Sequence, residues 1–128
     1  MQYGKRAFSI GLILLTLLLP LKALASDVLH VQLFFGLSIP NGGNVSQTEW
    51  NDFVSDHIAS RFDGFNIVDS TGYWKGKAET SKIVTIILKQ EELGKAESIA
   101  HAYATLYHQD SVMLVQSPVT QWEFVEQK

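Results

Sequence analysis

The sequence predicts a single α+β domain whose elements follow the order strand, helix, strand, strand, helix, strand. Two segments, 46–62 and 91–107, carry apolar residues at helical spacing, and the segments around them are rich in β-branched and aromatic residues. A chain of 128 residues is long enough for one domain. This element order is the split βαβ, or ferredoxin-like, plan: a four-stranded antiparallel sheet with both helices on one face.

The first 25 residues are predicted to be a secretory signal peptide, so the domain spans residues 26–128. Lys5 and Arg6 precede a short apolar run, and Ala23-Leu24-Ala25 supplies a cleavage motif. The run is too short for a natural stop-transfer segment, which favours cleavage over an uncleaved anchor. We therefore expect an exported protein, periplasmic or secreted, with no stable membrane span after cleavage.

The charge of the predicted mature chain argues against nucleic acid as a partner. Removing Lys5, Arg6 and Lys22 from the 10 basic side chains leaves 7 against 13 acidic ones, a net charge of −6. Phosphate neutralisation needs clustered Lys and Arg, and the chain has no basic run. It also has no cysteine, which excludes disulfides, iron–sulfur clusters and thiolate zinc sites.

The first strand and the first helix are predicted from alternation and from a capping motif. Residues 27–38 form the strand, and its core face is Val31, Leu33, Phe35 and Leu37. After a loop with Pro40 and paired glycines, Ser46-x-x-Glu49 is a capping box that marks the helix start. The apolar residues of this helix are Trp50, Phe53, Val54 and Ile58, with Phe62 just past its end.

A hairpin, a second helix and a last strand complete the predicted domain. A short strand at 65–69 is broken or bulged at 70–72, and residues 75–80 form a polar tip after Tyr73 and Trp74. Ser81–Leu88 is apolar on both parities, which indicates a central strand. The second helix is 91–107, with Leu106 widening its apolar stripe, and the last strand is 111–115, resumed as an edge by 119–125.

No element is left to cover the sheet face opposite the helices. The strand Ser81–Leu88 has apolar residues directed to both faces, so the second face also needs a cover. A second copy of the chain is the economical solution, since two-fold homodimers are the commonest oligomers. We expect a homodimer; the alternative is a different protein chain docked on this face.

A set of residues between the first strand and the central strand forms a specific pattern. Its members are Phe35-Gly-Leu-Ser38, Pro40-Asn-Gly-Gly43, Val45-Ser46, Glu49-Trp50, Phe53, Arg61-Phe62, Gly64, Asp69, Gly72, Trp74 and Ser81-Lys82. Through these residues the mature chain resembles a family of small exported bacterial proteins, catalogued as domain of unknown function 3574. The resemblance covers about residues 33–115 and brings no reaction, substrate or cofactor. Two positions depart from the family pattern: Asp63 replaces a proline and Tyr73 replaces a frequent glutamine.

Arg61 is a candidate anion-binding residue, because it is the one arginine after the predicted cleavage site. A guanidinium binds carboxylate or phosphate with two parallel hydrogen bonds. The alternative is a cation at the end of the first helix, paired with Asp69 or with a carbonyl of the last turn.

Four further residues of the hairpin have both a structural and a functional interpretation. Tyr73 and Trp74 form an aromatic pair suited to a ligand groove or a subunit interface. Asp69 is a general base if desolvated, and otherwise caps a turn with the residues that follow. Lys82 begins a strand, where its side chain can extend to solvent. Trp50, by contrast, belongs to the helix stripe and is predicted to be core.

No pattern predicts a catalytic reaction, a cofactor or a metal site. His101 and His108 lie seven residues apart with Glu97 nearby, which is typical of a solvated helix face rather than a zinc site. The chain has no nucleophile elbow and no Ser-His-Asp order. The leading hypothesis is therefore a non-catalytic binding or interaction domain in the cell envelope. The alternative is an enzyme or a binder of a small anionic ligand, with a pocket formed by Arg61, Asp69, Tyr73, Trp74 and Lys82.

Overall fold

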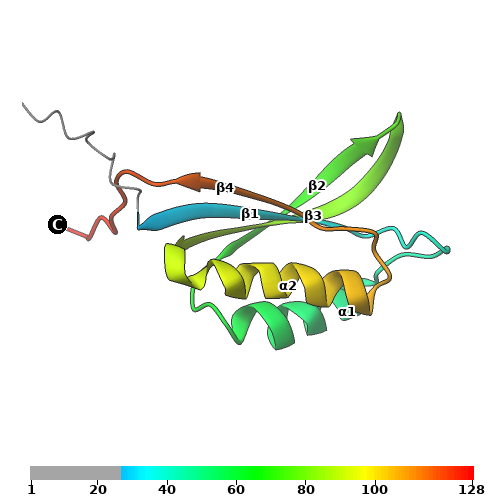
Figure 1. Ribbon diagram of the computed structural model, residues 1–128, viewed down its shortest axis with the longest axis horizontal. Helices are drawn as coiled ribbons and strands as arrows, with labels where there is room; N and C mark the ends of the chain where they lie inside the picture. Colours follow the sequence, from blue (N-terminus) through cyan, green and yellow to red (C-terminus); the bar gives the residue numbers. More distant parts are fainter. Residues whose placement is uncertain (1–26) are drawn as a thin grey trace, which may run out of the picture.

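The computed structural model describes residues 27–128, and the predicted signal peptide lies outside this range. Four strands form one antiparallel sheet in the order β2-β3-β1-β4. Both helices lie on one face of this sheet (Figure 1), which confirms the predicted ferredoxin-like plan. The elements are β1 (Val28–Gly36), α1 (Gln47–Phe53), a π-helical turn (Val54–Ala59), β2 (Asn66–Trp74), β3 (Lys77–Lys89), a 3₁₀ turn (Gln90–Glu92), α2 (Leu93–Leu106) and β4 (Met113–Pro118).

The core lies between the sheet and the two helices. Alternate residues of β1, from Leu29 to Phe35, are buried against the helices, as the sequence pattern predicts. Phe35 contacts an aromatic cluster whose ring centroids lie 4.8–5.8 Å from its own. The partners of Phe35 in this cluster are Trp50, Phe53 and Tyr103. The cluster therefore joins β1 to α1 and α2.

The first helix begins at the predicted cap and changes its pitch midway. Ser46 Oγ accepts from Glu49 N, and Glu49 Oε2 accepts from Ser46 N, so both halves of the capping box are formed. From Val54 to Ala59 the chain is π-helical rather than α-helical. Because a π-helix pairs residues five apart, Phe53 and Ile58 both lie buried on the face toward the core.

The β2–β3 hairpin is longer and more regular than predicted. The two strands pair without interruption from Asn66↔Thr85 to Trp74↔Lys77, so the predicted break or bulge at 70–72 is wrong. The turn is made by Lys75 and Gly76, whose φ angles of 48° and 78° are both positive. This is the two-residue turn whose twist matches that of paired strands, and it lets the ladder run through the polar tip.

Three boundaries near the C-terminus also differ from the prediction. Helix α2 begins at Leu93 after the 3₁₀ turn and ends at Leu106. Leu106 is 52% exposed, so it does not widen the buried stripe as predicted. Strand β4 runs from Met113 to Pro118 instead of 111–115. Residues 119–125 do not resume it as an edge strand, although the Val119 amide donates to the Val28 carbonyl.

Candidate functional site

Lys82 and Asp69 form an ion pair on the helix-facing side of the sheet. The two residues are cross-strand partners in β3 and β2, and Lys82 Nζ lies 2.5 Å from Asp69 Oδ1. The same ammonium lies 3.4 Å from Gln47 Oε1 at the start of α1. The Lys82 side chain is 10% exposed while that of Asp69 is 80% exposed. The lysine thus links the sheet to the first helix, and Asp69 is a strand residue rather than the turn cap that the sequence favoured.

Arg61 lies apart from this pair, at the end of the first helical segment. Its Nη1 donates to the His57 carbonyl at 2.8 Å. This is the interaction that a helix-end cation makes with a last-turn carbonyl, one of the two alternatives that the sequence left open. Within residues 27–128, no hydrogen bond or ion pair joins Arg61 to Asp69 or Lys82.

Tyr73 and Trp74 lie at the far end of β2, and each is 74% exposed. The Lys75 ammonium lies 5.9 Å from the centre of the Trp74 ring. Asp69 is four residues earlier on the same strand, roughly 13 Å away at the usual rise per residue. The structure therefore places the five predicted site residues in three locations: the Lys82–Asp69 pair, the helix end and the hairpin tip.

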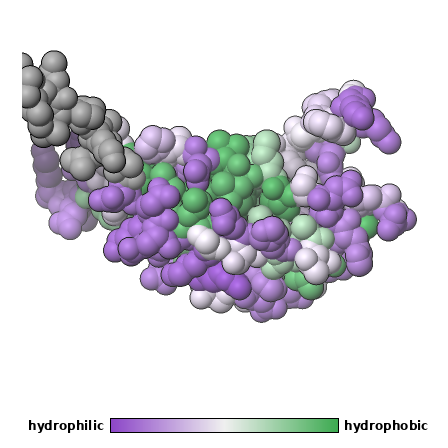
Figure 2. Space-filling model, viewed as in Figure 1, coloured by the Kyte–Doolittle hydropathy of each residue, from purple (hydrophilic) through white to green (hydrophobic). Residues whose placement is uncertain are grey.

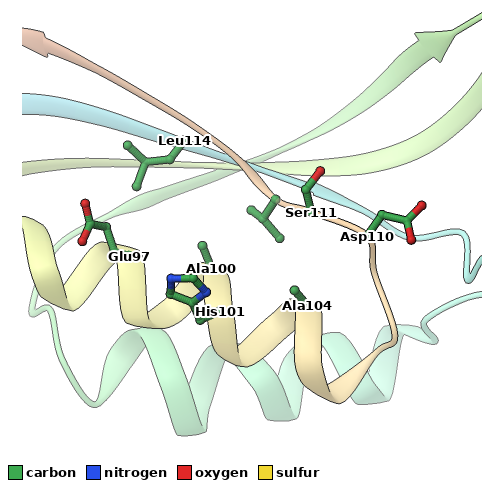
Figure 3. A pocket seen from close by; sticks show the side chains of 8 residues that line it. Glu97, Ala100, His101, Ala104, Asp110, Ser111 and Leu114 are labelled. Carbon is green, nitrogen blue, oxygen red and sulfur yellow. The ribbon is translucent and has the colours of Figure 1, made fainter.

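A cleft of about 360 Å³ lies elsewhere, between α2 and β4 (Figure 3). Ala100 and Ala104 extend from α2 toward the strand, and Glu97 and Asp110 lie near the two ends of the cleft. None of the five predicted site residues lines it. Alanines at helical spacing were the available signal, because small side chains leave room beside a strand. The full lining is Glu97, Ala100, His101, Ala104, Asp110, Ser111, Val112 and Leu114.

Tyr103 and Glu79 contact the backbone of the Phe35-Gly-Leu-Ser38 motif. The Tyr103 hydroxyl donates to the Gly36 carbonyl at 2.6 Å, and burial raises the pKa of Tyr103 above its ordinary value. A Cβ at Gly36 would lie 2.4 Å from Glu79 Oε1, which accepts from the Ser38 amide at 3.1 Å. The motif therefore positions the end of β1 against both α2 and the hairpin.

The sheet face opposite the helices carries an apolar row that crosses all four strands. The pairing register aligns Val68 with Ile83, Ile83 with Phe34, and Phe34 with Met113. Val68 and Met113, on the two outer strands, are 53% and 56% exposed. Figure 2 shows hydrophobic surface gathered over the middle of the sheet, with hydrophilic surface on the helix side and at the hairpin end.

Neither a metal-binding group nor a membrane-crossing helix is found in the described part of the chain. Among residues 27–128, no three His, Cys, Asp or Glu side chains gather to hold a metal ion. In the same range, every helix is too short or too polar to cross a membrane.

The comparisons with known proteins show a family and a fold. The profile of a family described as a protein of unknown function, DUF3574, matches residues 30–124. No curated protein matches the chain. A phage SAM lyase in complex with S-methyl-5′-thioadenosine is 21% identical over 77% of this chain and 86% of its own, with a TM-score of 0.58. A DUF3240 family protein from Shewanella baltica is 13% identical over 79% of this chain and 99% of its own, with a TM-score of 0.53. At these identities the two structures show a shared fold.

Proposed function

The chain belongs to the family of unknown function DUF3574, and we propose that it is an exported interaction domain that forms a homodimer through the open face of its sheet. The apolar row Val68–Ile83–Phe34–Met113 carries this proposal. Ile87 and Val115, which are 43% and 44% exposed, extend the apolar surface beside the row. An apolar surface that reaches across every strand of a sheet is typical of a face that another protein surface covers.

The absence of charge in the middle of this face favours a second copy as the partner. In a two-fold interface each chain presents the same patch, so a charged residue near the axis faces its own equivalent. The central part of the face carries no Asp, Glu, Lys or Arg. Its residues are His30, Gln32, Phe34, Asn66, Val68, Ser70, Ser81, Ile83, Thr85, Ile87, Met113, Val115 and Ser117. Such a face packs on itself without repulsion.

Dimer formation also agrees with the size and the predicted location of the domain. A chain of roughly a hundred residues buries a modest share of its surface on folding, and subunit pairing adds to it. An exported domain without cysteine has no disulfides to compensate. The predicted signal peptide supports placing this dimer in the envelope or outside the cell.

Sedimentation velocity on the purified protein and two variants tests the homodimer. We expect a dimer for the native chain and a monomer for Met113→Lys, because the new ammonium would be buried at the interface. Leu106→Lys is the matched control, since Leu106 on α2 is exposed to a similar degree, 52% against 56%. A monomeric native chain, or equal effects of the two variants, would refute the proposal.

A second candidate function is the binding of a small organic cation in the cleft between α2 and β4. The cleft has an apolar floor, its lining includes the carboxylates of Glu97 and Asp110, and the lining contains no Lys or Arg. This chemistry favours a cation over the anion considered from the sequence. SAM is a sulfonium cation, and the phage SAM lyase supplies it and S-methyl-5′-thioadenosine as probes for this chain.

Thermal unfolding with each of these two compounds tests the cleft. SAM, which carries the sulfonium charge, should raise Tm, and Glu97→Gln should lower that gain. S-methyl-5′-thioadenosine is an uncharged thioether and should raise Tm less than SAM. Glu91→Gln, an exposed carboxylate outside this cleft, is the control. No change in Tm with SAM, or an equal change with SAM and the neutral thioether, would contradict a cation site in this cleft.

A further inference from the structure

The end of the β2–β3 hairpin projects beyond the four-stranded sheet. Strand β1 ends opposite Ser81, so the pairs from Gly72↔Glu79 to Trp74↔Lys77 have no third strand beside them. Figure 1 shows this part of the hairpin rising away from the rest of the sheet. We name residues 72–79 the hairpin tip. A two-stranded ribbon without a packed face is only marginally stable in water, so its exposed residues need another reason to be there.

Aromatic and cationic side chains are concentrated at the hairpin tip. Tyr73 and Trp74 are each 74% exposed, which is unusual for side chains with so much apolar surface. Lys75 and Lys77 follow directly and are exposed. Nowhere else in residues 27–128 do two cationic side chains lie within three positions of each other. Between Asp69 and Glu79 there is no carboxylate.

The turn residue Lys75 adds a second, conformational observation. Its φ of 48° lies in the left-handed region, which glycine and asparagine adopt far more readily than lysine. The other turn residue, Gly76, is a glycine, which adopts its positive φ of 78° without strain. A lysine therefore occupies a position where the backbone alone would favour glycine or asparagine.

We propose that the hairpin tip binds the surface of a membrane that contains anionic lipids. Tyrosine and tryptophan partition to the headgroup region, where the ring meets apolar chains and the polar atom meets water. Lysines near the surface are attracted by acidic headgroups. The tip carries Lys75 and Lys77 against one carboxylate, Glu79, which is directed back to the Ser38 amide. The rest of residues 27–128 carries five basic against twelve acidic side chains, so an anionic surface repels the body and attracts the tip.

The two lysines also disfavour a two-fold contact between the tips of two copies, because like charges close to the axis would repel each other. The membrane contact is also independent of the homodimer proposed above. The open sheet face and the tip use different residues, so each can fail without the other.

Co-sedimentation with vesicles tests this site on the purified native protein. The probes are vesicles of phosphatidylglycerol and phosphatidylethanolamine, and vesicles of phosphatidylcholine alone. We expect binding to the first that falls as salt rises, and little binding to the second. Lys75→Gly with Lys77→Gln should weaken binding by roughly tenfold or more, from the usual contribution of each surface lysine. The glycine also suits the left-handed turn, so this variant keeps the hairpin.

Matched variants show whether binding depends on the residues of the hairpin tip or on any exposed lysine or tryptophan of the protein. Trp74→Ala should also lose binding, whereas Trp122→Ala, which removes a tryptophan 53% exposed in the C-terminal segment, should retain it. Lys89→Gln, an exposed lysine at the other end of β3, is the charge control. The proposal is overturned if the native protein does not bind anionic vesicles, or if tip and control variants bind alike. It is equally overturned if the tip variants change the oligomeric state instead.

Discussion

Lys82 shows how a single residue acquires its role from parts of the chain that are distant in sequence. Its ammonium is nearly buried and contacts the carboxylate of Asp69 on β2 and the amide oxygen of Gln47 at the start of α1. Replacing a buried ion pair by apolar groups is often neutral, whereas removing one partner leaves a buried charge unpaired. The loss of stability should therefore differ between a variant that removes the Asp69 carboxylate and one that removes the Lys82 ammonium.

We predict that Asp69→Ala destabilises the protein more than Lys82→Met does. The alanine leaves the ammonium with only the Gln47 amide, at a cost of about 1–2 kcal/mol, since the lost bond involves a charged donor. The methionine keeps the shape of the stem and removes the charge, so its cost should stay within about 1 kcal/mol. Urea unfolding followed by circular dichroism measures both, with Asp52→Ala on the exposed face of α1 as the control. A larger loss in Lys82→Met would show that the ion pair itself stabilises the fold.

At the scale of elements, the end of β1 and the base of the hairpin are fitted to each other at Gly36. The Glu79 carboxylate crosses over this glycine to reach the Ser38 amide, so any side chain at position 36 meets it. Glycine weakens a strand in general, and here the close approach of a neighbouring side chain explains its presence.

The matching prediction is that Gly36→Ala costs about 1 kcal/mol, because the new Cβ displaces the Glu79 carboxylate from its hydrogen bond to Ser38. In a Glu79→Ala background the carboxylate is absent, so Gly36→Ala should then change the free energy of unfolding very little. Urea unfolding of the four proteins of this cycle gives the coupling between the two sites. Equal effects of Gly36→Ala in both backgrounds would mean that the contact does not matter.

At the scale of the whole molecule, the aromatic cluster connects the sheet with both helices. Tyr103 contributes most to this connection, since it is fully buried against Phe35, Trp50 and Phe53 and donates to the Gly36 carbonyl. Burial raises the pKa of Tyr103, and it raises that of Tyr107 as well, with the nearby Glu49 carboxylate adding to the effect.

We predict that the protein loses stability above about pH 10 and that Tyr103→Phe reduces this loss. A folded-state pKa above the ordinary value of 10.0 means that the unfolded chain ionises first. The stabilisation is therefore complete below pH 10 and declines as the pH rises toward the folded-state pKa. Some loss of stability with rising pH should remain in the variant, because the pKa of Tyr107 is also raised. At pH 7 the variant should be about 1 kcal/mol less stable, because its hydrogen bond is lost.

Urea unfolding between pH 7 and pH 11 measures this, with Tyr73→Phe as the control, because Tyr73 is exposed at the hairpin tip. An unchanged alkaline slope in Tyr103→Phe would mean that other groups cause the loss.

Much of the fold could be predicted from the sequence, because its signals are local. Val31, Leu33 and Phe35 share one parity of β1 and are uniformly apolar, whereas the other parity is mixed, so the pattern indicates the buried face; the capping box at Ser46 indicates the start of α1. The burial of Trp50 follows from helical spacing. The uncovered second face of the sheet follows from the element order, and the structure resolves it into the apolar row from Val68 to Met113.

The tertiary structure alone decided where the candidate site residues lie, because this depends on long-range pairing rather than on spacing. Asp69 meets Lys82 only because the hairpin ladder continues through 70–72, and a one-residue bulge there would have turned them to opposite faces. The positive φ of Lys75 sets the turn and thereby extends the tip with Tyr73 and Trp74 into solvent. Sequence by itself determined the fold class, the core faces and the family resemblance. The register of the hairpin, which no local pattern encodes, decided which side chains meet.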